Sequence, residues 1–368
     1  VKEIRGSCWG RLCRRGYLTS MNDDLDLKRK QLVDRGQGII FPYSEKWSKS
    51  HAEFATKMWP NKLRRRNEAY IRWKFRGPQK GEVPGFLLAV LDGKVVGQLG
   101  LIPAKLWVDG KTLDAQWACD LMVDNDLRVQ GIGSLLLAAG MERDIITLGS
   151  NPSTLADISM SKLGFLPLTG PRAMIFPVDV DYVLDMMGFK SAKNKLFKKL
   201  LQTFLDLRNQ AFRKECTEQI PLIPTADLVD RIIEHQHGLK QPHIVHDSDF
   251  LNWRFSSVLP TNIHAWVSST TGYAVSEPTP RTYYVYDWFA ENKSDFQFLF
   301  QQMLLDAVTA GCQSVMAYAN SSAEVYHLKR LGFVSMRMPV KVIYFPQGKL
   351  GVDTQQFHYC IYDSDGNL

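Results

Sequence analysis

The chain has 368 residues, enough for two domains of ordinary size, and its 45% hydrophobic and 23% charged residues are typical of a globular protein. No apolar run reaches the length of a membrane span, and the first residues lack the apolar core of a signal peptide. The net charge is +7, but residues 190–214 alone contain eight Lys/Arg and one Asp. A charge concentrated in one segment argues against a nucleic-acid partner, which needs a broad basic surface.

The cysteines and histidines show no metal-ligand spacing. Six cysteines are scattered without a C-x-x-C pair, and we expect free thiols in a reducing compartment. Imidazoles and carboxylates gather near residue 240, but their spacing matches no zinc site and their neighbours are typical of a loop and a helix cap. We therefore expect no metal. The residues of this group are His235, His237, His243, His246, Asp247 and Asp249.

The first third of the chain predicts a tail, two helices and an antiparallel meander. Residues 1–35 are expected to form an N-terminal tail, in which either Met21 starts the native chain or the residues before it are a natural flexible extension. The spacing of apolar residues predicts helices at 45–58 and 68–75. Asp-Gly pairs between apolar runs predict tight hairpins. The strands are Phe86–Val90, Lys94–Val108 and Lys111–Val123, joined at Asp92-Gly93 and Asp109-Gly110.

The third strand runs into a glycine loop with the pattern R-x-x-G-x-G. Without Cβ atoms, Gly131 and Gly133 let the backbone approach a diphosphate, and the start of the following helix favours an anion. Arg128 can add a charged hydrogen bond. The loop lacks the G-K-[ST] of a P-loop and the third glycine of a dinucleotide fold; its other explanation is tight strand–helix packing. The backbone N–H groups expected to face the phosphates are those of Val129, Gln130, Gly131, Ile132, Gly133 and Ser134.

The elements after the loop complete an α+β order. Apolar spacing predicts a helix at Gly131–Asp144, a short strand at Ile145–Leu148, a helix at Ser153–Leu163 and a closing strand at Arg172–Val178.

Residues 40–178 resemble the GCN5-related N-acetyltransferase (GNAT) family. The R-x-x-G-x-G loop carries this resemblance, with Asn151-Pro152-Ser153 and with Ser161-Lys162-Leu163-Gly164-Phe165, which is similar to the second signature of the family. The resemblance implies an α+β acyl-CoA N-acyltransferase fold, a mixed sheet flanked by helices, whose loop grips the diphosphate of acetyl-CoA. A protein that uses acetyl-CoA is expected in the cytoplasm.

The resemblance also assigns roles in the strand before the loop. Backbone groups of Leu121 and Val123 are expected to pair with the pantetheine arm, and Met122 or Val123 to offer an N–H to the thioester carbonyl. Asp120, the only ionisable residue of residues 117–123, is the candidate base. Equally, Asp120 could face a cation and be structural.

The resemblance also bears on Met160, Asn151 and Ser153. Met160 stands where the family has a tyrosine acid, and a thioether gives no proton, so Ser159, Ser161 or water would have to protonate the thiolate. Asn151 and Ser153 could hydrogen-bond the pantetheine or could cap a helix.

The second half repeats the first in weakened form. Residues 249–255 repeat 69–75, Arg330-Leu331-Gly332-Phe333 repeats Lys162-Leu163-Gly164-Phe165, and Asp287 falls where Asp120 fell. Residues 290–295 contain no glycine and two acids where a diphosphate would lie, so the second copy is expected to be degenerate. The predicted domains are a tail (1–35), an acetyl-CoA-binding domain (36–180), a basic helical linker (181–220), a degenerate GNAT-like domain (221–347) and a C-terminal tail (348–368).

Two basic segments carry partner hypotheses. In residues 190–214, lysines alternate with apolar residues at helical spacing, which suits a helix packed on its own protein or, less often, one resting on an anionic membrane surface. Arg64-Arg65-Arg66 could hold a phosphate of the acceptor or could be a solvated helix approach.

Together these features predict an N-acetyltransferase that moves an acetyl group from acetyl-CoA to a primary amine of a small molecule by direct attack. The repeated Trp-Lys/Arg-Phe segment and Asn-Pro-Ser look similar to members encoded with bacterial envelope polysaccharide enzymes, which makes an amino sugar the first expected acceptor. The alternatives are a non-catalytic acyl-CoA-binding or regulatory module, favoured by Met160, and an aminoacyltransferase of the peptidoglycan-bridge type, whose folds lack a working CoA loop.

Overall fold

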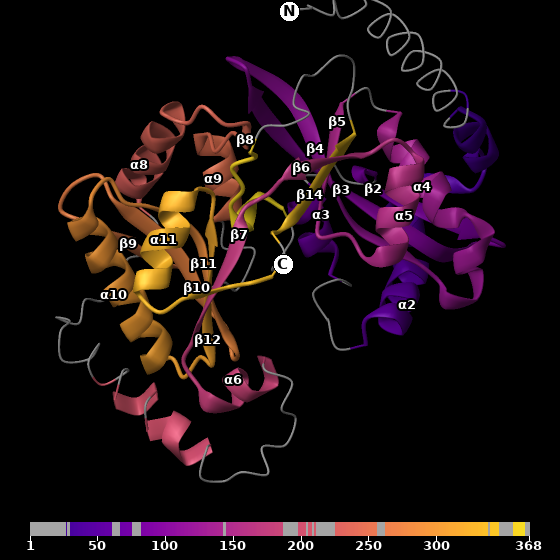
Figure 1. The fold of residues 1–368 in the computed structure, drawn as a ribbon. Coiled ribbons are helices and arrows are strands. Elements are labelled where there is room, and N and C mark those ends of the chain that lie inside the picture. Colours follow the sequence, from indigo (N-terminus) through magenta and orange to yellow (C-terminus); the bar gives the residue numbers. More distant parts are fainter. Residues whose placement is uncertain are drawn as a thin grey trace, which may run out of the picture. The chain divides into compact units, whose positions relative to one another are not determined.

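The computed structural model describes residues 27, 30–60, 67–75, 82–142, 145–186, 198–203, 205–207, 210, 225–255, 262–337, 339–345 and 356–364. The chain divides into two compact units, each built from several segments (Figure 1). The first unit contains Val1–Pro103, Ala115–Leu166 and Ile343–Leu350, and the second contains Ala104–Asp114, Pro167–Val342 and Gly351–Leu368. Most of the predicted tail, most of residues 190–214 and Arg64-Arg65-Arg66 lie outside the described residues.

The predicted meander is confirmed. Strands β2 (Val83–Leu91), β3 (Lys94–Val108) and β4 (Lys111–Val123) follow one another, and β2 pairs antiparallel with β3. Both connecting dipeptides adopt left-handed backbone angles, with φ of 49° at Asp92 and 74° at Gly93, and of 49° at Asp109 and 78° at Gly110. Paired positive φ values are the geometry of a type I′ hairpin turn, which Asp-Gly favours.

The first sheet has the order β1 (Ile40–Tyr43), β2, β3, β4, β5 (Ile146–Ser150), β14 (Lys341–Phe345) and β6 (Leu166–Thr169), and β8 (His243–Ile244) pairs with the far end of β3. Helices α4 (Ile132–Met141) and α5 (Thr154–Lys162) lie side by side. Helix α4 buries an apolar face because Ile132, Leu136 and Leu137 pack with Leu99 and Leu101. This unit also contains η1 (Glu45–Trp47), α2 (Ser48–Met58), α3 (Glu68–Phe75) and η3 (Asn125–Gln130), and residues 30–36 are helical.

The second sheet has the order β13 (Val334–Ser335), β7 (Arg172–Pro177), β12 (Ser314–Ala319), β11 (Thr282–Phe289), β10 (Tyr273–Pro278) and β9 (His264–Val267). Its elements follow the chain as strand, strand, strand, helix, strand, helix, strand, which repeats the order of the first unit from β2 to β6. The helices are α6 (Val180–Met186), α8 (Ala226–His237), α9 (Ser248–Arg254), α10 (Lys293–Thr309), α11 (Ser322–Arg330) and η4 (Ile361–Asp363).

The two sheets exchange a strand. Arg172–Val178 was expected to close the first sheet, but β7 lies in the second, between β12 and β13. In Figure 1 it appears as a magenta strand among orange ones, and β14 as a yellow strand among purple ones. Strand β14 occupies the corresponding place in the first sheet, between β5 and β6. The exchanged strands contribute to the cores of the sheets that they join. Ile343 and Phe345 of β14 are buried in the first core, and Phe176 of β7 is buried in the second.

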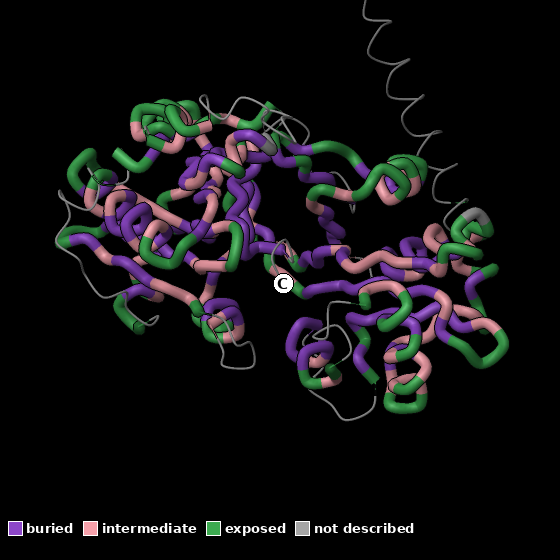
Figure 2. The backbone as a smooth tube through the Cα atoms, turned by 90° about the horizontal axis from the view of Figure 1, so that it is seen from below, coloured by how far each residue is buried: buried purple, intermediate pink, exposed green. Residues whose placement is uncertain are grey.

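Residues 356–364 pack into the second unit, whereas residues 348–368 were expected to form a tail. Within residues 356–364, five large or apolar side chains are buried, namely Phe357, Tyr359, Cys360, Ile361 and Tyr362. Figure 2 shows buried residues dominating the strands, and exposed ones the loops and outer helical turns. No helix of the described residues combines the length and apolarity that crossing a membrane requires.

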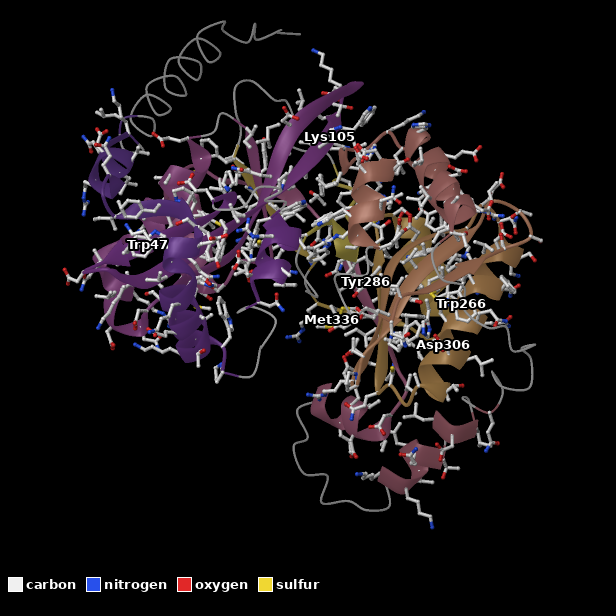
Figure 3. The ribbon with its side chains drawn as sticks, turned by 180° about the vertical axis from the view of Figure 1, so that it is seen from behind. Trp47, Lys105, Trp266, Tyr286, Asp306 and Met336 are labelled. Atoms are coloured by element: carbon white, nitrogen blue, oxygen red, sulfur yellow. The ribbon has the colours of Figure 1, made fainter. Side chains whose placement is uncertain are left out.

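Partly buried polar groups in the second core are paired. Asp306 on α10 accepts hydrogen bonds from the Tyr283 hydroxyl at 2.6 Å and from His264 Nδ1 at 2.5 Å. Figure 3 labels Asp306 and, on β9, the neighbouring core residue Trp266. Burial and the adjacent carboxylate raise the pKa of Tyr283 well above its usual value, so its hydroxyl stays a donor.

Candidate functional site

Strand β4 parts from β5 just before the glycine loop. Within these described strands, the parallel pairing runs from Ala115 with Ile146 to Trp117 with Leu148 and ends there. Asp120 then adopts φ of 51°, a left-handed value that is uncommon outside glycine and that Asp tolerates better than most residues. A residue of this conformation breaks the regular strand, and the part of β4 that follows faces no paired residue of β5.

The two edges of β4 after Asp120 have different neighbours. The Asp124 N–H donates to the Val96 carbonyl at 2.8 Å, and the Met122 carbonyl also lies against β3, beside Gly97. The Val123 carbonyl accepts from Arg128 Nε at 3.4 Å, on the opposite edge. Since backbone groups alternate along a strand, Leu121 and Val123 present their polar groups to the open edge and Met122 does not.

The glycine loop is shaped by one left-handed residue. Gly131 has φ of 82°, and a Cβ built on it would meet nothing within 4 Å. Its carbonyl accepts from Ser134 N–H at 3.0 Å and Leu135 N–H at 3.1 Å, so these two amides are engaged in the helix. The first-turn N–H groups of Ile132 and Gly133 have no acceptor inside α4. Open space therefore lies beside Gly131, next to the residues that supply two amide donors at the positive end of a helix dipole.

The remaining predicted loop residues lie around this point. Gln130 is exposed in η3 and Val129 precedes it; the side chain of Val129 is outside the described part of the structure. Asp124 caps η3 by accepting from the Asp126 N–H, and Lys57 Nζ lies 2.8 Å from both of its carboxylate oxygens. The hydrogen bond from Lys57 lowers the pKa of Asp124, which therefore stays an anion and supports the turn.

Asp120 is ion-paired. Lys74 Nζ lies 2.6 Å from Asp120 Oδ2, and the two side chains are 0% and 7% exposed. The Lys74 ammonium also lies 5.9 Å from the ring centre of Tyr70 and 5.5 Å from that of Phe75. Lys74 is therefore the cation that the structural alternative for Asp120 requires. Sequence reasoning had placed this lysine on an ordinary amphipathic helix.

A second polar pair reaches the backbone of Asp120. His51 Nε2 lies 3.0 Å from Gln98 Oε1, and Gln98 Nε2 donates to the Asp120 carbonyl at 3.3 Å. Both side chains are buried. Burial lowers the pKa of His51 to about 4, so the imidazole is neutral at pH 7. Sequence reasoning missed both residues, because His51 is one of several polar residues on an amphipathic helix and Gln98 is a single polar residue in an apolar strand.

Acidification should destabilise the protein because folded His51 stays neutral. Between pH 6.5 and 4 the unfolded chain takes up a proton that folded His51 does not, so the free energy of unfolding falls as the pH falls. The loss is expected to reach about 3 kcal/mol for this residue. Urea unfolding at several pH values should show a shallower dependence in His51→Asn than in the parent. The exposed His327→Asn serves as control and should keep the parental slope; equal slopes in all three proteins would contradict the argument.

The residues of the second signature are mostly structural. Ser153 Oγ accepts from the Ala156 N–H at 3.4 Å and so caps α5. Asn151 is exposed with φ of 42°. Met160 is buried and packs in the first core with Phe165 and Ile343. This packing explains the thioether at Met160 without a catalytic role.

An acetyltransferase (GNAT) family model matches residues 45–165, which include the parted strand and the glycine loop. We call residues 45–165, which match this family model, the GNAT domain. A search of curated proteins finds no match to the sequence.

Solved structures agree with this fold. A GCN5-related N-acetyltransferase from Kribbella flavida has a TM-score of 0.56 and 13% identity, covering 83% of this chain and 70% of its own. A GCN5-related N-acetyltransferase from Anabaena variabilis has a TM-score of 0.55 and 12% identity, covering 83% and 71%. N-myristoyltransferase from Saccharomyces cerevisiae, with bound myristoyl-CoA, has a TM-score of 0.55 and 12% identity, covering 86% and 84%. At such identities these likenesses establish the fold, over more of the chain than the GNAT domain alone.

The second unit has the same parted strands but a different neighbour for them. Strands β11 and β12 pair from Thr282 with Ser314 to Tyr284 with Met316. Beyond that point the C-terminal segment, residues 356–364, engages both sides. The Tyr359 N–H donates to Asn320 Oδ1 at 2.9 Å, and the Tyr362 hydroxyl donates to Asp287 Oδ2 at 2.7 Å. The chain itself therefore occupies the place that is open beside β4 in the GNAT domain.

The group of histidines and acids weighed as a metal cluster does not converge as a whole. His237 is exposed, and Asp247 caps α9 by accepting from the Phe250 N–H at 2.8 Å. Asp247 also pairs at 3.3 Å with Lys105, which Figure 3 labels. His246 Nε2 lies 2.5 Å from Asp363. The predicted group is therefore divided between a helix cap, a surface ion pair and a buried pair with the C-terminal segment.

Proposed function

We propose that the GNAT domain binds an acyl-CoA along the open edge of β4 and transfers its acyl group directly to an amine. The observation that carries this proposal is that three features follow one another along the chain: the edge of β4 at Leu121 and Val123, beyond the pairing with β5, the left-handed Gly131, and the start of α4. The N–H groups of Ile132 and Gly133, with Arg128, suit a diphosphate. The backbone groups of Leu121 and Val123 suit the amides of pantetheine, which would pair with β4 as a neighbouring strand does.

The geometry favours Val123 over Met122 for the thioester carbonyl. An N–H on the open edge can stabilise the negative charge that develops on the carbonyl oxygen as the amine attacks. The Met122 carbonyl lies on the β3 side of the strand, beside Gly97. We therefore assign the oxyanion contact to Val123 and a supporting position to Met122.

Asp120 is our candidate for accepting the proton of the amine. Its carboxylate is held at the break in β4 by Lys74, and its backbone by Gln98. Both contacts fix the position of the carboxylate, which general-base catalysis requires. Asn151, Ser153 and Met160 receive no catalytic role in this proposal, and the thiolate leaves with a proton from water or from Ser159 or Ser161.

The acyl group is proposed to be acetyl. A long hydrocarbon chain that reached Asp120 and Lys74 would have to lie against a buried ion pair, which is unfavourable for both. An amino sugar remains the proposed acceptor and the cytoplasm the proposed location. A non-catalytic acyl-CoA-binding module and a peptidoglycan-bridge-type aminoacyltransferase are the competing functions; the first would bind acyl-CoA without turnover, and the second would not need the loop.

A matched pair of substitutions at Gly131 tests the proposal. Asn and Asp have nearly equal shape and both tolerate a left-handed φ, and the space before Gly131 is open, so both variants should fold. Only Asp brings a negative charge to the place proposed for the diphosphate. Calorimetric titration with acetyl-CoA and CoA should show Gly131→Asp binding about 10–100-fold more weakly than Gly131→Asn.

Gly93 offers a control for this pair. It also has a left-handed φ, 74°, and open space around its missing Cβ. Gly93→Asn and Gly93→Asp should bind CoA equally well. Absence of CoA binding by the parent protein, or equal binding by the two Gly131 variants, would overturn the proposed site.

A further inference from the structure

Three side chains that can bind a metal meet inside the second unit. Asp287 lies on β11, and His358 and Cys360 lie on the C-terminal segment. Cys360 Sγ is 3.2 Å from Asp287 Oδ1 and 3.6 Å from His358 Nε2, and all three donor atoms lie within 4.8 Å of one another. All three residues are buried.

We propose that Asp287, His358 and Cys360 bind a Zn²⁺ ion. Zinc takes thiolate, imidazole and carboxylate ligands at about 2.3, 2.0–2.1 and 2.0–2.2 Å in a tetrahedron, which places pairs of donor atoms about 3.3–3.6 Å apart. The separations of Cys360 Sγ from its two neighbours, 3.2 and 3.6 Å, agree with that spacing. A thiolate and a carboxylate would also balance the charge of the cation.

Neighbouring groups already hold the ligands in place. The Tyr362 and Tyr273 hydroxyls donate to Asp287 Oδ2 at 2.7 and 3.1 Å. Asp287 Oδ1 accepts from the Trp288 N–H at 2.8 Å and lies 3.2 Å from Cys360 Sγ. Such outer contacts are what orient carboxylate ligands in metal sites. The ring of His235, at 6.1 Å from that of His358, is a candidate fourth ligand beside water.

The metal would fasten the C-terminal segment to β11. This segment lies beside the parted strands of the second unit, and two of the three ligands belong to it. Asp287 is far in sequence from His358 and Cys360, and the latter two lie in residues expected to be a tail, which is why spacing within the chain gave no signal.

Metal content of the full-length protein tests the proposal. After growth with added zinc, the parent should contain about one Zn²⁺ per chain by mass spectrometry, and Cys360→Ala and His358→Ala at least 10-fold less. Cys312→Ala is the matched control, because Cys312 is another buried free thiol of the same unit, bonded to the Thr279 carbonyl, and should retain the metal.

A measurement on the parent alone covers the case in which the variants fail to fold. Protein produced with cobalt(II) should show a thiolate-to-cobalt charge-transfer band, absent in apoprotein prepared with chelator. A parent with less than 0.1 metal per chain and no such band would overturn the proposal, leaving Cys360 as a thiol that donates to Asp287. Metal that survives Cys360→Ala would overturn it equally.

Discussion

Replacing Lys74 with methionine is expected to destabilise the protein by about 3–5 kcal/mol, because the substitution removes the cation that lies 2.6 Å from the buried carboxylate of Asp120. Asp120→Asn should cost a similar amount by leaving the Lys74 ammonium beside a neutral amide. Combining Lys74→Met with Asp120→Asn removes both charges and should recover most of the loss. Urea unfolding followed by circular dichroism measures all three free energies. Lys57→Met, which breaks an ion pair with a half-exposed lysine, should cost less than about 1 kcal/mol and is the control.

The double variant also separates catalysis from structure. If Asp120 accepts the proton of the amine, the refolded double variant should bind acetyl-CoA with parental affinity and turn over about 10²–10⁴-fold more slowly. Recovery of both stability and turnover in the double variant would show that Asp120 is structural only. Turnover is measured by release of free CoA thiol with a panel of amines, amino sugars among them.

A chain ending at residue 180 is expected not to fold, although it contains the whole glycine loop. Without β14 it has a gap between β5 and β6, and the buried side chains of Ile343 and Phe345 are missing from its core. Strand β7 would remain without its partners β12 and β13. The truncated chain should be insoluble, or should lack the dispersed amide spectrum of a folded domain and bind no CoA.

A chain with rearranged strands tests whether the absence of β14 prevents the truncated chain from folding. Residues 339–347 joined by a short linker after residue 169, in place of β7, would put β14 back between β5 and β6. This chain should be soluble and bind CoA where the simple truncation does not. CoA binding of parental affinity by the chain ending at residue 180 would contradict the importance of the exchanged strand.

Local sequence patterns predicted the strands and hairpins well, but they predicted less well which strands share a sheet. The Asp92-Gly93 and Asp109-Gly110 hairpins were predictable, because the two residues that tolerate positive φ stand between alternating strands. The sheet to which Arg172–Val178 belongs was not, because consecutive strands usually share a sheet and nothing in that segment opposes this default.

The sequence indicates backbone features of the candidate site but not the side-chain contacts around it. The glycine loop has a fixed pattern that links residue type to conformation, and the structure gives Gly131 a left-handed φ. Lys74 gave no such signal, because a lysine on a short helix is usually solvated, and its partner Asp120 is far away in sequence. Contacts of this kind depend on tertiary packing and leave no periodicity.

The exchanged strands also set the order of events during synthesis. Strand β5 ends at Ser150, and its partner β14 begins at Lys341. At about 5–20 residues per second, the ribosome needs about 10–40 s to extend the chain from one to the other. Throughout that interval the nascent first sheet has a gap between β5 and β6, with unpaired edges that other chains could bind. The GNAT domain, although encoded first, can therefore reach its native state only after the second unit has almost entirely been made.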